Sequence, residues 1–258
     1  MACVVGHDGR ARGASVARAC SDTGTALVGG ETAEHPGLMG ADDYDVAGAA
    51  DGVVEADRLL GAERVRDGDV VIAIASSGLH SNGFSLVRHI LSGAKIGYAD
   101  AAPDLGATWG EALLEPTRLY TGPLVRLIED DRFAASLHSL SHVTGGGIAA
   151  NLARVLPRGS WVELDRATWS PAPVFRVLND LAGTTLESTE GTWNLGIGFF
   201  AVVAADAAAD VVAELGALGL PAWQAGTVAI GDRDLAGFEQ GAKGVDGGAV
   251  RLVGSYAD

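Results

Sequence analysis

Residues 70–91 constrain the fold of this chain more than any other stretch. They begin with Val-Val-Ile-Ala-Ile-Ala at 70–75, the small and β-branched apolar pattern of a strand that is buried on both faces. A polar loop with two glycines follows at 76–83, and from Phe84 the apolar residues recur with the spacing of an amphipathic helix. The stretch therefore predicts a strand, a tight loop and a helix.

The loop at 76–83 has the chemistry of an anion site. A helix that begins directly after a loop points its free backbone N–H groups, and the positive end of its dipole, at whatever the loop holds, most often a phosphate. Beside Gly78, the loop adds polar side chains at Ser77, His80, Ser81 and Asn82. An ordinary turn between a strand and a helix, in which Ser and Asn only cap the helix, has the same pattern.

A second loop of this design lies at 142–147, His-Val-Thr-Gly-Gly-Gly, between a short apolar run and another predicted helix. Three consecutive glycines allow the backbone to approach a ligand closely and to adopt φ > 0. Each of the two loops carries a histidine ahead of its helix, so together they indicate two anionic groups held in one cleft.

A third unusual loop, at 29–36, begins with Gly-Gly-Glu-Thr. Carboxylates at Glu31 and Glu34 could stand beside a cleft in which Mg²⁺ bound to a nucleotide needs oxygen ligands. A solvated turn is the other interpretation. It is preferred for Glu34, and both interpretations stay open for Glu31.

The composition excludes several classes of protein. A chain of 258 residues, 48% of them hydrophobic, fits one large domain or two modest ones. A net charge of −15 argues against binding to nucleic acid and to anionic membrane surfaces. Two cysteines make neither a disulfide framework nor a metal set, no apolar run is as long as a membrane span, and the N-terminus has no signal-peptide pattern. We therefore expect a soluble cytoplasmic protein.

The predicted elements indicate an α/β (α+β) fold, because strands and helices intermix along the whole chain. A turn at residues 67–69 places a domain boundary there and gives domains 1–66 and 67–258. The predicted strands are 25–28, 46–54, 70–75, a segment within 133–143, 161–164, 199–204, 223–230 and 250–253, and the predicted helices are 14–20, 84–91, 117–130, 174–181 and 207–218.

Six motifs occur in order along the chain. Three are the loops at 29–37, 76–86 and 142–148, and three are Glu-Ala-Leu-Leu-Glu-Pro-Thr-Arg at 111–118, Thr-Trp-Ser-Pro-Ala-Pro-Val-Phe at 168–175 and Trp-Asn-Leu-Gly-Ile-Gly at 193–198. Together they resemble phosphoribosylformylglycinamidine cyclo-ligase, also called aminoimidazole ribonucleotide synthetase. The resemblance extends from about residue 10 to the C-terminus.

The resemblance implies an ATP-dependent ring closure in purine biosynthesis, in which formylglycinamidine ribonucleotide becomes aminoimidazole ribonucleotide with release of ADP and phosphate. It implies ATP and Mg²⁺ as cofactors, and a homodimer where the full-length domain is present. His80 and His142 are then candidates for phosphate contact or proton transfer, and Glu31 for the metal. The residues expected to bind the phosphates of ATP or substrate are Gly29, Gly30, Thr32, Ser77, Gly78, Ser81, Asn82, Thr144, Gly145, Gly146, Gly147 and Asn151.

The sequence departs from the family pattern at its N-terminal end. The resemblance implies a remnant of an N-terminal ATP-binding domain ahead of a C-terminal mixed-sheet domain with helices packed on it. The family's Gly-x-Gly-Thr-Lys loop, expected before residue 1, does not occur in the sequence. Two alternatives therefore stay open: a non-catalytic fragment or subunit that needs a separate N-terminal piece, and a related ATP-using synthetase or kinase. Trp193 and Phe199 are larger than the residues usual in the family.

Overall fold

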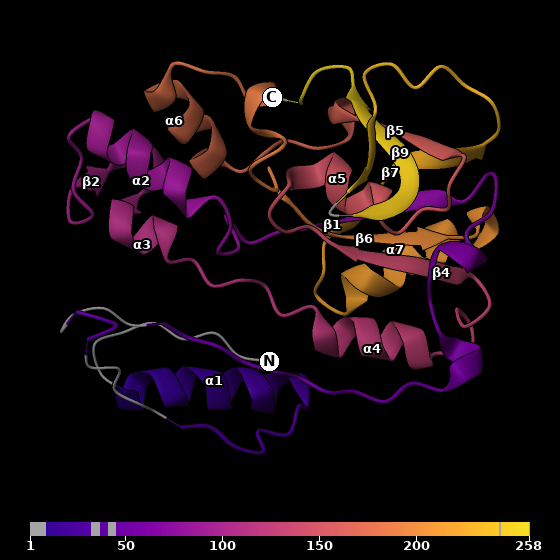
Figure 1. Ribbon diagram of the computed structural model, residues 1–258, viewed down its shortest axis with the longest axis horizontal. Coiled ribbons are helices and arrows are strands. Elements are labelled where there is room, and N and C mark those ends of the chain that lie inside the picture. Colours follow the sequence, from indigo (N-terminus) through magenta and orange to yellow (C-terminus); the bar gives the residue numbers. More distant parts are fainter. Residues whose placement is uncertain (1–8, 32–36, 41–44, 243, 258) are drawn as a thin grey trace. The chain divides into compact units, whose positions relative to one another are not determined.

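The computed structural model describes residues 9–31, 37–40, 45–242 and 244–257 (Figure 1). The chain divides into two compact units. One comprises residues 1–59 and 119–125, and the other comprises residues 60–118 and 126–258. The domain boundary between residues 66 and 67 stays a prediction.

In the first unit, helix α1 (Gly9–Thr23) extends the helix predicted at 14–20 at both ends. The strands predicted at 25–28 and 46–54 are wrong. Neither segment pairs with a neighbour in the described part of the chain, and a strand forms only where a second strand supplies its ladder hydrogen bonds. Apolar side chains in both segments face solvent, and Val28 and Val53 are 96% and 101% exposed.

The second unit is built on a mixed sheet of seven strands in the order β4-β6-β1-β7-β5-β9-β8. The strands β5 and β9 pair in parallel, and the other neighbours pair antiparallel. Strand β1 lies between β6 and β7 with its first five residues buried, which confirms the strand predicted at 70–75. The strands are β1 (Val70–Ala75), β4 (Leu137–His142), β5 (Ser160–Asp165), β6 (Ile197–Val203), β7 (Ala222–Ile230), β8 (Glu239–Ala242) and β9 (Val245–Val253).

The sheet curls around the short helix α5 (Gly147–Ala153), which contacts β4 at one edge of the sheet and β8 and β9 at the other. Gly247 permits this approach, since a Cβ there would lie 2.2 Å from the carbonyl oxygen of Ala153. Helix α7 (Ala208–Ala217) packs against β7 and β1, and α2 (Phe84–Gly93) packs against α6 (Pro173–Ala182) (Figure 1). This layering of helices on a mixed sheet confirms the α/β (α+β) class.

Several short elements differ from the prediction. Strands β2 (Ala101–Ala102) and β3 (Ala107–Thr108) form a small ladder, and α3 (Trp109–Leu113) follows it. A capping box formed by Thr108 and Glu111 starts α3, and apolar periodicity does not reveal such a local signal. Helix α4 (Thr121–Glu129) begins later than predicted. The 3₁₀ turns are Ala56–Arg58, Ala62–Arg64, Pro103–Leu105, Arg166–Thr168, Glu187–Thr189 and Ala205–Ala207.

Among the described residues, every helix is too short or too polar to cross a membrane.

Candidate functional site

Three neighbouring strands of the second unit end together and carry the loops that the sequence singled out. Cross-strand pairs join His142 to Phe199 and Ala75 to Ile197. The C-terminal ends of β4 and β1 therefore lie beside the N-terminal end of β6. The loops that leave this end of the sheet are 76–83, 143–147 and 190–196.

His80 organises the first of these loops from its buried side. Its Nε2 accepts hydrogen bonds from the backbone N–H of Ser77 at 2.9 Å and of Arg118 at 3.4 Å, so the pattern assigns the ring proton to Nδ1. The Ser77 hydroxyl lies 2.9 Å from the same nitrogen and donates to the carbonyl oxygen of Pro116 at 2.6 Å. His80 therefore ties the loop to the segment 116–118.

The backbone at the tip of this loop is strained. His80 and Ser81 have φ angles of 55° and 59°, and Leu195 in a neighbouring loop has a φ of 45°. In the described ranges Lys95 is the remaining non-glycine residue with a positive φ. The left-handed region costs an ordinary residue about 1–2 kcal/mol, and such strain concentrates at functional sites. Three of these four residues lie in the loops at this end of the sheet.

The triple-glycine loop is held tightly against the loop at 190–196. Gly147 has a φ of +74°, and a Cβ on it would lie 1.7 Å from the carbonyl oxygen of Glu190. The same oxygen accepts a hydrogen bond from the N–H of Ile148 at 3.1 Å. The buried amide of Asn151 donates to the carbonyl oxygens of Gly147 at 2.6 Å and Thr144 at 3.0 Å. Asn151 thus holds the loop from the inside of the protein.

Asn194 joins the first loop to the third. Its side chain is buried, and its Nδ2 donates to the carbonyl oxygen of Gly78 at 2.8 Å. Its Oδ1 accepts from the hydroxyl of Ser76 at 3.0 Å and from the N–H of Gly196 at 2.9 Å. Every hydrogen-bonding contact of this amide therefore fixes the backbone or a side chain of a site loop.

The two large residues noted in the sequence have separate roles. Trp193 is fully buried beside Phe175, with ring centroids 6.1 Å apart, and a Cβ on Gly83 would lie 2.4 Å from its Cδ1. Phe199 instead stacks on the imidazole of His142, with centroids 5.2 Å apart and an angle of 14° between the planes. Trp193 thus packs against the loop at 76–83, and Phe199 packs against the exposed imidazole of His142.

Two histidines lie at this end of the sheet, and each has an arginine near it: Arg118 is near His80, and Arg154 is near His142. Burial, followed by the nearby His142 and Arg118, lowers the pKa of His80 from 6.5 to about 4. Burial, followed by Arg154, also lowers the pKa of His142. Both imidazoles are therefore mostly uncharged at neutral pH, and the arginines supply the positive charge. This arrangement favours a bound anion and leaves His142 able to accept a proton.

The structure brings together the predicted residues of the second unit. A Cβ on Gly145 would lie 3.9 Å from the Oδ1 of Asn82, so the first two loops are neighbours. Ser81, His142, Gly145 and Gly146 are exposed, Ser77, Asn82 and Thr144 are half-buried, and Gly78, His80, Gly147 and Asn151 are buried.

The remaining predicted residues belong to the first unit. Gly29, Gly30 and Glu31 are exposed, and Thr32 lies outside the described residues. Over the described ranges, no three His, Cys, Asp or Glu side chains are grouped so that they could hold a metal ion. A single carboxylate such as Glu31 suits Mg²⁺ only where phosphate oxygens of a bound nucleotide supply other ligands.

Sequence reasoning did not single out Arg118, Arg154 and Asn194 as site residues. Arg118 and Asn194 stand in the motifs at 111–118 and 193–198, so those motifs contained a usable signal. Arg154 caps the C-terminal end of α5 and donates to the Oδ1 of Asn151. Its place beside His142 depends on how α5 packs against the sheet, which residue spacing does not reveal.

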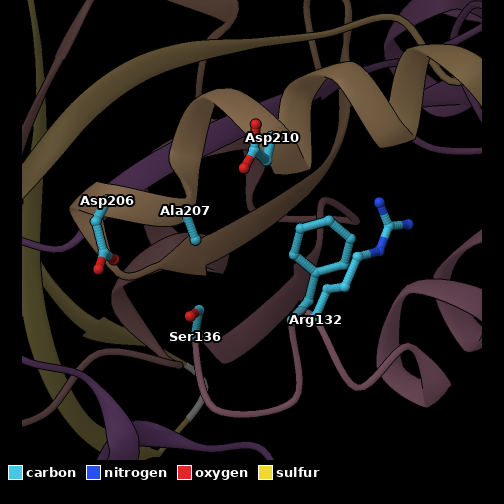
Figure 2. Close-up of a pocket in the computed structure, with 6 residues that line it drawn as sticks. Arg132, Ser136, Asp206, Ala207 and Asp210 are labelled. Atoms are coloured by element: carbon cyan, nitrogen blue, oxygen red, sulfur yellow. The ribbon is translucent and has the colours of Figure 1, made fainter.

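A polar depression of about 430 Å³ lies elsewhere in the second unit (Figure 2). Ser136 precedes β4 and Asp206 follows β6, so the depression is at the opposite end of these strands from His142. Its Arg132 is already paired with Asp130 at 2.6 Å and Glu214 at 2.8 Å. The six lining residues are Arg132, Phe133, Ser136, Asp206, Ala207 and Asp210, and none of them is a predicted site residue.

Residues 66–235 match the family described as AIR synthase related protein, C-terminal domain. The matched range includes the loops at 76–83, 143–147 and 190–196 and the strands from which they leave. The chain belongs to the AIR synthase related family.

Curated relatives named phosphoribosylformylglycinamidine cyclo-ligase confirm the resemblance drawn from the six motifs. The chain is 41% identical over 218 residues to that of Synechocystis sp., 44% over 221 residues to that of Sorangium cellulosum, and 40% over 224 residues to that of Bacillus subtilis. Each match covers 84% of this chain. The chain spans 62–63% of the length of these relatives.

Solved structures give more distant matches. Thiamine-monophosphate kinase from Stenotrophomonas maltophilia has a TM-score of 0.48 and 19% identity, over 79% of this chain and 56% of that one. HypE from E. coli has a TM-score of 0.44 and 20% identity, over 76% and 50%.

Proposed function

We propose that this chain takes part in the ATP-dependent cyclisation of formylglycinamidine ribonucleotide to aminoimidazole ribonucleotide, with release of ADP and phosphate. One observation carries the proposal: three loops leave the same end of β4, β6 and β1 and gather His80, His142, Arg118 and Arg154. Relatives about 40% identical to the chain carry the name of this ligase.

The reaction sets requirements that these residues can meet. The formyl oxygen attacks the γ-phosphorus of ATP and ADP leaves; the amidine nitrogen then attacks the activated carbon, loses a proton, and the C–O bond to phosphate breaks. Catalysis of such transfers depends on positioning and on neutralising phosphate charge. In the proposal, Arg118 and Arg154 neutralise charge, and the exposed backbone of Gly145 and Gly146 contacts a phosphate.

The two histidines have different parts in this proposal. The neutral imidazole of His142 is the candidate to accept the proton from the amidine nitrogen, because it is exposed and a substrate can reach it. His80 is buried and accepts backbone hydrogen bonds, so its proposed part is to hold the loop in which Ser77, Ser81 and Asn82 meet the ligand.

The proposal extends to Mg²⁺, to the cytoplasm, and to a homodimer where the full-length domain is present. Glu31, with Gly29, Gly30 and Thr32, would meet the metal and phosphates of ATP. Apolar side chains of the first unit are exposed, above all those of Val28 and Val53. This exposure supports the proposal that another protein surface packs against the first unit. A partner copy, or an N-terminal piece supplied separately, would provide such a surface.

Ligand binding and ADP release test the proposal. We expect the full chain to bind formylglycinamidine ribonucleotide in a calorimetric titration, and Arg154→Met to weaken that binding by roughly tenfold, as for a lost charge-assisted contact. Arg158→Met is the matched control, because Arg158 is 82% exposed and pairs with Asp246 on the surface. ADP release is then measured with the chain alone and with the N-terminal segment of a relative added. No binding and no ADP release under either condition contradicts the proposal.

A further inference from the structure

The side chain of Glu190 is the centre of a polar cluster in the second unit. Its carboxylate accepts hydrogen bonds from Arg166, from Nε at 2.6 Å and from Nη2 at 3.0 Å, and from the hydroxyl of Tyr256 at 2.6 Å. The side chains of Arg166 and Glu190 are only 13% and 15% exposed. A two-point pair of this kind holds a carboxylate in one orientation.

The C-terminal segment is anchored on both sides of Tyr256. The Nη1 of Arg166 donates to the carbonyl oxygen of Gly254 at 3.1 Å, and Arg176 donates to that of Ala257 at 2.6 Å. The ring of Tyr256 meets that of Trp169 edge to face, with centroids 5.2 Å apart. These contacts hold the C-terminal segment in place, so that the hydroxyl of Tyr256 lies at the carboxylate of Glu190.

Burial, followed by the hydrogen bond to the Glu190 carboxylate, raises the pKa of Tyr256. The hydroxyl consequently keeps its proton and remains a donor at any pH at which the protein works. The hydrogen bonds that Arg166 donates to the Glu190 carboxylate also raise the pKa of Arg166, which stays a cation. Arg166 and Tyr256 therefore both remain hydrogen-bond donors to the carboxylate.

The backbone of the same residue determines where the triple-glycine loop lies. Its carbonyl oxygen accepts the N–H of Ile148, and it occupies the space that a Cβ on Gly147 would need. A shift of Glu190 must therefore move the loop at 144–147. The side chain of Glu190 and the loop are connected through one residue.

We infer that Glu190 is a positioning residue, whose side chain is clamped by Arg166 and Tyr256 so that its carbonyl oxygen sets the place of the triple-glycine loop. The inference rests on the proposed function, in which this loop contacts a phosphate of the substrate. It gives the C-terminal segment a part in substrate binding, because the hydroxyl of Tyr256 holds the side chain of Glu190, whose carbonyl oxygen contacts the N–H of Ile148 behind the loop.

Tyr256→Phe tests the clamp, because it removes the hydroxyl and keeps the ring against Trp169. We expect amide hydrogen exchange at Ile148 to accelerate by about tenfold, the effect of losing one hydrogen bond to a charged group. Amides of β1, a buried strand between β6 and β7, should accelerate less. Affinity for formylglycinamidine ribonucleotide should fall several-fold. Tyr98→Phe, a change of the same chemistry at an exposed tyrosine, should alter none of these.

The outcomes separate the clamp from the proposed function. Equal acceleration at Ile148 and in β1 would mean that Tyr256 only stabilises the unit, and this result overturns the inference. Unchanged exchange and unchanged affinity also overturn it while the proposed function stands. Faster exchange at Ile148 in a chain that never binds formylglycinamidine ribonucleotide supports the clamp and contradicts the proposed function. Arg166→Lys, which keeps the charge but loses the two-point geometry, should repeat the Tyr256→Phe result.

Discussion

Gly147→Ala should destabilise the second unit far more than a glycine substitution normally does. The added Cβ would lie 1.7 Å from the carbonyl oxygen of Glu190, 2.6 Å from its carbonyl carbon and 2.7 Å from the Cα of Gly191. All three atoms are backbone, so no side chain can turn away. Ordinary contact begins near 3.4 Å, and one of the two loops must therefore move by more than an ångström.

The expected loss has three parts. Alanine at a positive φ costs about 1–2 kcal/mol, partly offset by the lower entropy of the unfolded chain. Separating Ile148 from Glu190 removes a backbone hydrogen bond worth about 1 kcal/mol. Leaving a buried backbone group without its partner adds about 1–3 kcal/mol. Together these place the loss in free energy of unfolding at about 3–5 kcal/mol.

Gly159→Ala isolates the first of these contributions. Gly159 has a φ of +78°, close to that of Gly147, and a Cβ on it would meet no atom within 4 Å. We expect it to cost about 1 kcal/mol. All five tryptophans lie in the second unit, so their fluorescence during urea unfolding follows that unit alone. A difference of less than about 1 kcal/mol between the two variants would refute the steric argument, given that hydrogen-bond loss alone should exceed it.

Two further predictions concern buried polar groups of the site. Burial lowers the pKa of His80 from 6.5 to about 4, so between these pH values the unfolded chain binds a proton that the folded chain does not, and stability should fall by up to about 3 kcal/mol as the pH is lowered. Urea titrations at several pH values should show this slope. The slope should be unchanged in His89→Gln, whose histidine is exposed, and smaller in His80→Gln, where the lowered pKa of His142 still contributes. Asn194→Ala should cost about 2–4 kcal/mol, because it leaves buried loop groups without partners, whereas Ser76→Ala, which removes one of those bonds, should cost about 1 kcal/mol. Equal losses for the two variants would argue against Asn194 as the joining residue.

Local patterns predicted the strands and helices of the second unit well. The apolar run at 70–75 and the helical spacing from Phe84 reflect burial of one element's own side chains, and β1 and α2 appear where expected. Helix α6 begins at Pro173, one residue before the helix predicted at 174–181, and proline is common at the first position of a helix. Such signals act within a few residues, so the sequence is sufficient to read them.

The wrong predictions share one cause. Segments 25–28 and 46–54 have apolar residues, but a strand also needs a partner, and apolar character alone does not supply one. The missed strand β8 shows the reverse, since this short segment is a strand because it pairs with β9. Strand pairing depends on two segments, so the residues of one segment alone do not reveal it.

The sequence by itself determined the family, the strand–loop–helix pattern and the glycines that allow the loops to pack closely, because these depend on residue identity and short-range geometry. Only the tertiary structure decided that β4, β6 and β1 end together, that Arg118 and Arg154 stand beside the two histidines, and that Asn194 and Glu190 hold the loops in place. These relations join residues up to more than a hundred positions apart, as the hydrogen bond between Asn194 and Gly78 does. They arise from strand order and from the curl of the sheet around α5, which no local pattern specifies.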